Sequence, residues 1–174
     1  MDSKLTLFSQ IISKIDRVIF KKIVKEKKTD YRNKGFDSWT HLVSMLFCHF
    51  AKSTSVRDIS NGLRSATGNL NHLGIKTAPS KSSISYQNGK RDADLFKDVY
   101  FKLLEQLGQH TKERRIKLKI KVPVYLLDST LISLCLSLFD WATYRTKKGA
   151  VKMHTLLEYD GKLPVYVNIT KGSV

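Results

Sequence analysis

The stretch VPVYLLDST, residues 122–130, decides the fold of the C-terminal part of the chain. Its first six residues form an apolar run that predicts a buried strand, and the run ends in a lone acid, Asp128. An ionised carboxylate at the end of a buried strand costs on the order of several kcal/mol unless a cation, donors or water compensate it. Asp128 is therefore a candidate metal ligand. The alternative is an aspartate that serves only as a turn or capping residue.

The residues around this stretch alternate with a period of two, which is typical of strands. Apolar side chains and lysines alternate over 116–121, whereas the earlier part of the chain follows a helical period. Three strands are expected, at about 122–128, 150–158 and 163–170, with a hairpin turn at Asp160-Gly161. The change of period places a domain boundary near residues 110–115.

The N-terminal part carries the three- and four-residue spacing of amphipathic helices. Apolar positions recur in this way over 5–23, which predicts one long first helix. Ser38 and Ser55 are placed to cap a second and a third helix. The last helix, over 95–107, is expected to end at Gly108.

The segment 55–91 is arranged like a helix-turn-helix. A helix is followed by a polar connection over 66–79 and by a short helix that carries Lys81, Lys90 and Arg91. In a helix-turn-helix the second helix lies in the major groove of DNA. The connection is long for that motif, so two roles stay open for this helix: it reads the groove, or it packs in the domain and contacts phosphates.

The chain is strongly basic. Its 174 residues include 31 Lys and Arg against 15 Asp and Glu, which gives a net charge of +16. Most of the excess lies before Asp128, because residues 1–121 carry 25 basic and 11 acidic side chains. That excess is larger than solubility requires and points to nucleic acid as the partner.

The composition also excludes several classes of protein. Cys48 and Cys135 lie in apolar runs without ligand spacing, so neither a zinc site nor a disulfide is expected. The histidines form no ligand pattern and, apart from His154, are expected to be structural. No apolar run is long enough to span a membrane and no signal peptide is recognised, so a cytoplasmic protein is expected.

Several segments together resemble the N-terminal half of transposases of the insertion-sequence-four group, whose catalytic domain is ribonuclease-H-like. In the C-terminal part the resemblance is carried by residues 127–130, 133–142, Arg145 and 148–155. Residues 36–42 and 56–59 are similar to the helical domain that precedes the catalytic domain in one branch of this group. The resemblance covers nearly the whole chain.

The resemblance implies an α+β protein of two domains. Residues 1–112 would form an all-helical DNA-binding domain, and residues 113–174 the first three antiparallel strands of a ribonuclease-H-like domain. It implies an enzyme of bacterial insertion sequences, located in the cytoplasm at the nucleoid, that cuts transposon ends and joins them to target DNA. Double-stranded DNA is then the partner, and the full-length family acts as a homodimer.

The resemblance also implies a catalytic site with an Asp-Asp-Glu triad that holds two Mg²⁺ or Mn²⁺ ions. Asp128 matches the first acid and would be both catalytic and a metal ligand. The second acid and the glutamate follow the third strand in the family, so this chain is expected to stop before them and to be inactive alone. Asp140, Glu158 and Asp160 match no member of the triad and are expected to be turn residues.

A basic segment follows Asp128 and is expected to touch DNA phosphates or to position the substrate near Asp128. Lys152 and His154 share one face of their strand by the period of two. The alternative is a solvated strand face whose lysines extend into water. The candidate residues are Arg145, Lys147, Lys148, Lys152 and His154.

Two other functions stay open. The chain would bind transposon-end DNA without cutting it, as a truncated remnant or a competitor of an intact transposase. The last alternative is a general nucleic-acid-binding protein unrelated to transposition.

Overall fold

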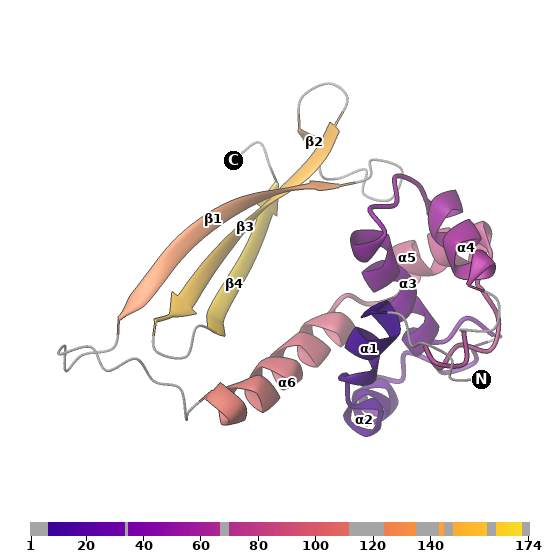
Figure 1. Ribbon diagram of the computed structural model, residues 1–174, viewed down its shortest axis with the longest axis horizontal. Coiled ribbons are helices and arrows are strands. Elements are labelled where there is room, and N and C mark those ends of the chain that lie inside the picture. Colours follow the sequence, from indigo (N-terminus) through magenta and orange to yellow (C-terminus); the bar gives the residue numbers. More distant parts are fainter. Residues whose placement is uncertain are drawn as a thin grey trace. The chain divides into compact units, whose positions relative to one another are not determined.

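The computed structural model describes residues 7–33, 35–66, 70–111, 124–134, 143–144, 148–159 and 163–171. The described chain combines helices with an antiparallel sheet, which confirms the mixed α+β class (Figure 1). It divides into two compact units, Met1–Val99 and Tyr100–Val174. The expected boundary between residues 112 and 113 lies outside the described residues.

The described residues of the first unit form five helices and the start of a sixth (Figure 1). The expected single helix over 5–23 is wrong, because Asp16 interrupts it and caps the second helix by accepting hydrogen bonds from the amides of Val18 and Ile19. The helices are α1 (Leu7–Ser13), α2 (Arg17–Lys27), α3 (Ser38–Phe50), α4 (Val56–Ser65), α5 (Lys81–Lys90) and α6 (Asp94–Thr111), which continues into the second unit.

The helix ends follow local capping chemistry. Ser55 caps α4 as predicted, since its hydroxyl accepts from the amide of Asp58. The cap of α3 is Asp37, whose carboxylate accepts from Thr40, and the predicted cap Ser38 is instead a buried residue of the helix. The expected stop at Gly108 is wrong, because α6 runs through it to Thr111.

The core of the first unit joins segments that are far apart in the sequence. The rings of Phe20 on α2 and Trp39 on α3 meet edge to face at 5.2 Å, and Trp39 donates its indole N–H to the carbonyl of Leu73 at 2.8 Å. Ile59 on α4 and Ile84 on α5 are fully buried. Burial of these side chains holds α2 to α5 and the loop after α4 together.

The second unit contains a sheet with β3 (Lys148–Glu158) at its centre (Figure 1). β1 (Tyr125–Leu134) and β4 (Leu163–Lys171) pair with β3 antiparallel on its two sides, which agrees with three consecutive antiparallel strands. The short β2 (Thr143–Tyr144) pairs with the start of β3. The expected turn at Asp160-Gly161 lies outside the described residues.

β1 differs from its prediction in two ways. It continues to Leu134, so Asp128 lies inside the strand rather than at its end. It is also exposed rather than buried: Leu126 and Leu127, which point to opposite faces, are 48% and 77% exposed.

Among the described helices, none combines the length and the apolar character needed to cross a membrane.

Candidate nucleic-acid interface

Asp128 lies on β1 opposite Thr155 of β3. Its side chain is exposed, and one carboxylate oxygen accepts a hydrogen bond from the hydroxyl of Thr130 at 2.8 Å. The desolvation argument that singled out Asp128 therefore does not hold in this structure, because water solvates an exposed carboxylate at little cost. Position and hydrogen bonding make it an accessible acid on a strand.

Lys152 and His154 lie on the other face of the sheet. In the antiparallel register His154 is opposite Ser129 and Lys152 is opposite Leu131. Ser129 and Leu131 come one and three residues after Asp128 on β1. Directly opposed residues share a face and successive residues alternate, so Asp128 points to one face and this pair to the other. The expectation that Lys152 and His154 position a substrate near Asp128 is therefore wrong for this sheet.

The described residues do not form a two-metal site. Among them there is no group of three or more His, Cys, Asp or Glu side chains that could hold a metal ion. Asp128 alone supplies one carboxylate, whereas a pair of Mg²⁺ ions needs several. Arg145, Lys147, Asp140 and Asp160 lie outside the described residues, and for Lys148 the structure describes the backbone only.

Lys81 and Lys90 lie at the two ends of α5, and both are exposed. Ser80 caps this helix by accepting from the amide of Ser83 at 3.1 Å. Of the helix residues only Ile84 is buried. The exposed positions recur at alternating steps of one and three residues and so form one face, which we call the α5 polar face: Lys81, Ser82, Ser85, Tyr86, Gly89 and Lys90.

Tyr86 is the aromatic residue of the α5 polar face and is 61% exposed. The Lys90 ammonium donates to its hydroxyl at 3.0 Å and lies 5.2 Å from its ring centre. No role was predicted for Tyr86 from the sequence. The signal was its spacing of four residues from Lys90, which places both on one helix face.

Arg91 is buried and bonded within the helical unit, which argues against its predicted contact with DNA. Its side chain is only 2% exposed. The guanidinium lies 3.3 Å from the Asp30 carboxylate and donates to the backbone carbonyls of Phe36 and Asp37. These bonds tie the end of α5 to the loop before α3, so we remove Arg91 from the predicted DNA contacts.

His41 is also structural, as predicted. It is 2% exposed and packs between the rings of Phe36, at 5.5 Å, and Phe96, at 5.2 Å. Burial, and to a smaller extent the positive charge of Arg91, lowers the pKa of His41 to about 4, against an opposing contribution from Asn88. The imidazole is therefore neutral at pH 7.

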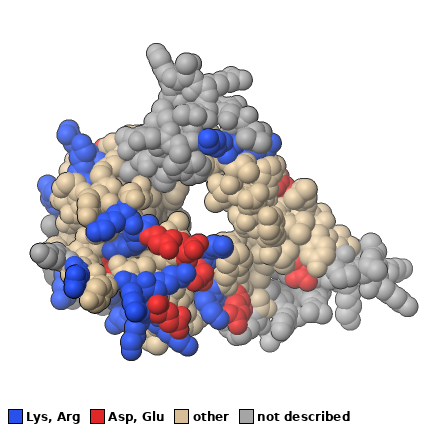
Figure 2. All heavy atoms as spheres, turned by 180° about the vertical axis from the view of Figure 1, so that it is seen from behind, with Lys and Arg blue, Asp and Glu red and all other residues tan. Residues whose placement is uncertain are grey.

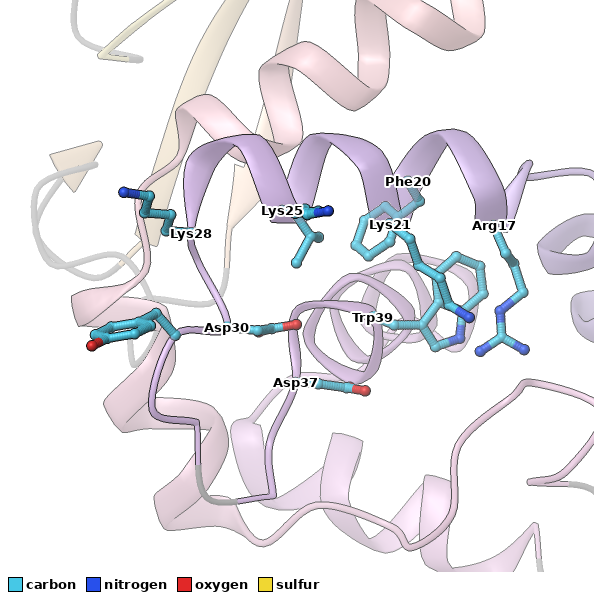
Figure 3. Close-up of a pocket in the computed structure, with 10 residues that line it drawn as sticks. Arg17, Phe20, Lys21, Lys25, Lys28, Asp30, Asp37 and Trp39 are labelled. Atoms are coloured by element: carbon cyan, nitrogen blue, oxygen red, sulfur yellow. The ribbon is translucent and has the colours of Figure 1, made fainter.

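Basic side chains gather over the helical unit (Figure 2). Some of them line a pocket beside α2, formed by Arg17, Lys21, Lys25 and Lys28 together with Trp39 of α3 (Figure 3). No site was predicted at Lys21 or Lys25 from the sequence. The pocket could not be predicted because it also needs the loop after α2 and the start of α3, whose packing against α2 the spacing within one helix does not show.

Comparison with known proteins identifies one segment of the chain. Residues 3–76 match a domain of unknown function, DUF4372. This domain is found in transposase-like proteins. The match covers α1 to α4 and the loop that contacts Trp39, and it ends before α5. No curated protein and no solved structure matches the chain.

Proposed function

We propose that the chain is a transposase polypeptide of the insertion-sequence-four kind, whose helical unit binds double-stranded DNA at transposon ends. The observation that carries the proposal is the α5 polar face. A ten-residue helix with a single buried residue gains little from packing, so its polar surface calls for another explanation. Contact with DNA supplies one.

The dimensions and the side chains of α5 suit a major groove. The groove is about 12 Å wide and admits one helix of about 10–12 Å diameter. The α5 polar face carries short side chains at Ser82, Ser85 and Gly89, which allow close approach, and a Cβ added at Gly89 would meet no atom within 4 Å. Lys81 and Lys90 flank them and would contact phosphates on either side.

α4 supports this arrangement as the first helix of a helix-turn-helix would. It packs against α5, and the hydroxyl of Ser60 on α4 donates to the carbonyl of Pro79 at 2.8 Å, next to the cap of α5. Arg57 and Arg64 on α4 are exposed. In the motif the first helix crosses the DNA backbone, where such cations bind phosphates.

The enzymatic part of the proposal concerns the second unit. Its three antiparallel strands support a ribonuclease-H-like assignment, and Asp128 is proposed as the first acid of the catalytic triad. A polypeptide that carries Asp128 together with the rest of the triad should lose cleavage of transposon ends in Mg²⁺ when Asp128→Ala is introduced. Retained cleavage would remove Asp128 from the site.

A second candidate function is DNA binding without cleavage, as a competitor of intact transposase. Among the described residues Asp128 belongs to no group of three or more side chains that could hold a metal ion, and this favours the second candidate. Duplex binding by the 174-residue chain without cutting in Mg²⁺ supports this candidate. Cutting by the chain itself would exclude it.

The proposal is tested with charge-matched variants of the full chain. Lys81→Gln/Lys90→Gln should weaken binding to a fluorescent duplex roughly tenfold at about 100 mM salt and lower the slope of log K against log salt by about 2. Lys14→Gln/Lys22→Gln removes the same charge from exposed lysines elsewhere and is the control. Equal losses in both variants would mean that α5 makes no particular contact.

A further inference from the structure

The pocket beside α2 has the features of a binding site of its own. It has a volume of about 810 Å³, which is within the range of small-ligand sites. All of its lining residues belong to the first unit, from α2, the following loop and the start of α3 (Figure 3). None of them lies on the α5 polar face.

A row of cations runs along one side of this pocket. Arg17, Lys21, Lys25 and Lys28 follow one another at steps of three or four residues, which places them on one side of α2 and its C-terminal end. We call these four residues the α2 cation row. Like charges at such spacing destabilise a helix by a few tenths of a kcal/mol per pair.

The lysines of the row keep their charge unpaired within the described part of the chain. No acid there lies within ion-pair distance of Lys21, Lys25 or Lys28, whereas the neighbouring Lys27 pairs with Asp98 at 2.9 Å. Arg17 differs from the lysines, because its guanidinium lies 4.6 Å from the Trp39 ring centre and donates to the Gly74 carbonyl.

The two acids in the pocket are held by other groups. Asp30 accepts from the amide and hydroxyl of Ser38 at 2.8 Å and faces Arg91. Asp37 caps α3 through the amide of Thr40. These bonds offset both negative charges, so the pocket as a whole attracts anions.

The rest of the lining is apolar and aromatic. Phe20, Val24 and Trp39 form the inner wall, and Phe20 and Trp39 are almost completely buried. Tyr31 at the edge is 72% exposed, and the Arg32 guanidinium lies 5.2 Å from its ring centre. A ligand that fits must therefore combine negative charge with a flat ring.

We propose that this pocket binds an unpaired nucleotide of single-stranded DNA. The base of this nucleotide lies against Tyr31, and the phosphates of the strand on either side of it lie along the lysines of the α2 cation row. The choice of a nucleic acid rests on the function proposed above, while the site is separate from the α5 polar face. Cationic rows with aromatic platforms are the common means of binding single strands. An opened transposon end would present such a strand.

The phosphate contacts are tested by fluorescence anisotropy of a labelled oligo-dT with the full chain. Lys21→Gln/Lys25→Gln should weaken oligo-dT binding at least tenfold more than Lys14→Gln/Lys22→Gln, which removes the same charge outside the pocket. Lys81→Gln/Lys90→Gln should leave oligo-dT affinity close to that of the control. Equal losses in the row variant and the control would overturn the site.

The base contact is tested with an abasic oligonucleotide of the same length. The unchanged chain should bind it roughly tenfold more weakly than oligo-dT, the scale of one base–aromatic stack. Tyr31→Ala should remove that difference, and a Tyr31→Phe variant should keep it. Equal affinity of the unchanged chain for both oligonucleotides would show that no base occupies the pocket.

The two proposals fail separately in these experiments. If Lys81→Gln/Lys90→Gln has no effect on duplex binding, the α5 interface is wrong, but an oligo-dT loss confined to the row variant still supports the pocket. If the row variant weakens duplex and oligo-dT equally, the pocket does not select single strands, and the α5 interface is unaffected.

Discussion

At the scale of the residue, His41 links the stability of the first unit to pH. Its pKa of about 4 in the folded chain lies below the ordinary value of 6.5, so the unfolded chain binds the proton more tightly between these values. The contribution of neutral His41 to the free energy of unfolding is therefore fully present above pH 6.5 and is lost as the pH falls toward 4. The loss from pH 7 to pH 5 should be about 2 kcal/mol.

This loss is measured by urea unfolding of the full chain at several pH values, followed by helical circular dichroism. His41→Phe, or His41→Met if the larger ring disturbs packing, should remove this part of the pH dependence. The variants are compared by the slope of the free energy of unfolding against pH, not by its absolute value. An unchanged slope in both variants would contradict a buried neutral His41.

Arg91 gives a second prediction at this scale. Arg91→Met keeps most of the side-chain volume but removes the guanidinium from Asp30, which keeps its bonds from Ser38, and from the carbonyls of Phe36 and Asp37. Urea unfolding of this variant should show a free energy of unfolding lower by about 3 kcal/mol. Duplex affinity of the folded variant should equal that of the unchanged chain. A tenfold loss of affinity at unchanged stability would return Arg91 to the interface.

At the scale of the element, two glycines in helices should respond in opposite directions to the same substitution. A Cβ at Gly62 of α4 would lie 2.6 Å from the Phe47 ring on α3, so Gly62→Ala should destabilise the chain by about 1–3 kcal/mol despite the better helix propensity of alanine. Gly89 of α5 has open space around it, so Gly89→Ala should stabilise by about 0.5–1 kcal/mol. Thermal unfolding of both variants tests this, and a stabilised Gly62→Ala would show that α3 and α4 are not in close contact.

Some helices and strands could be predicted from residues close together in the sequence, and others could not. The cap at Ser55 and the existence of α5 and of three strands followed from spacing and turn chemistry. Their antiparallel arrangement was what the family resemblance implied. The break at Asp16 was missed because the apolar stripe continues across it, and only the capping bonds stop the first helix. The length of β1 was missed because strand ends depend on pairing with β3, which spacing in one strand does not contain.

At the scale of the whole molecule, the candidate sites depended on long-range pairing. The basic charge and its concentration before Asp128 are properties of the sequence alone. The placement of Asp128 and His154 on opposite faces follows from the register of two strands, and the burial of Arg91 follows from contacts with the distant loop before α3. Neither result could be predicted from the residues adjacent in sequence to Asp128, His154 or Arg91.

The most direct test of the α5 interface is selection of duplex sites from a randomised pool by the full chain. We expect an enriched sequence motif, and we expect Ser82→Ala/Ser85→Ala to change it, because short polar side chains on a groove-facing helix contact base edges. The Lys14→Gln/Lys22→Gln control should select the unchanged motif. A pool without enrichment, or the same motif from the serine variant, would contradict the reading of DNA by α5.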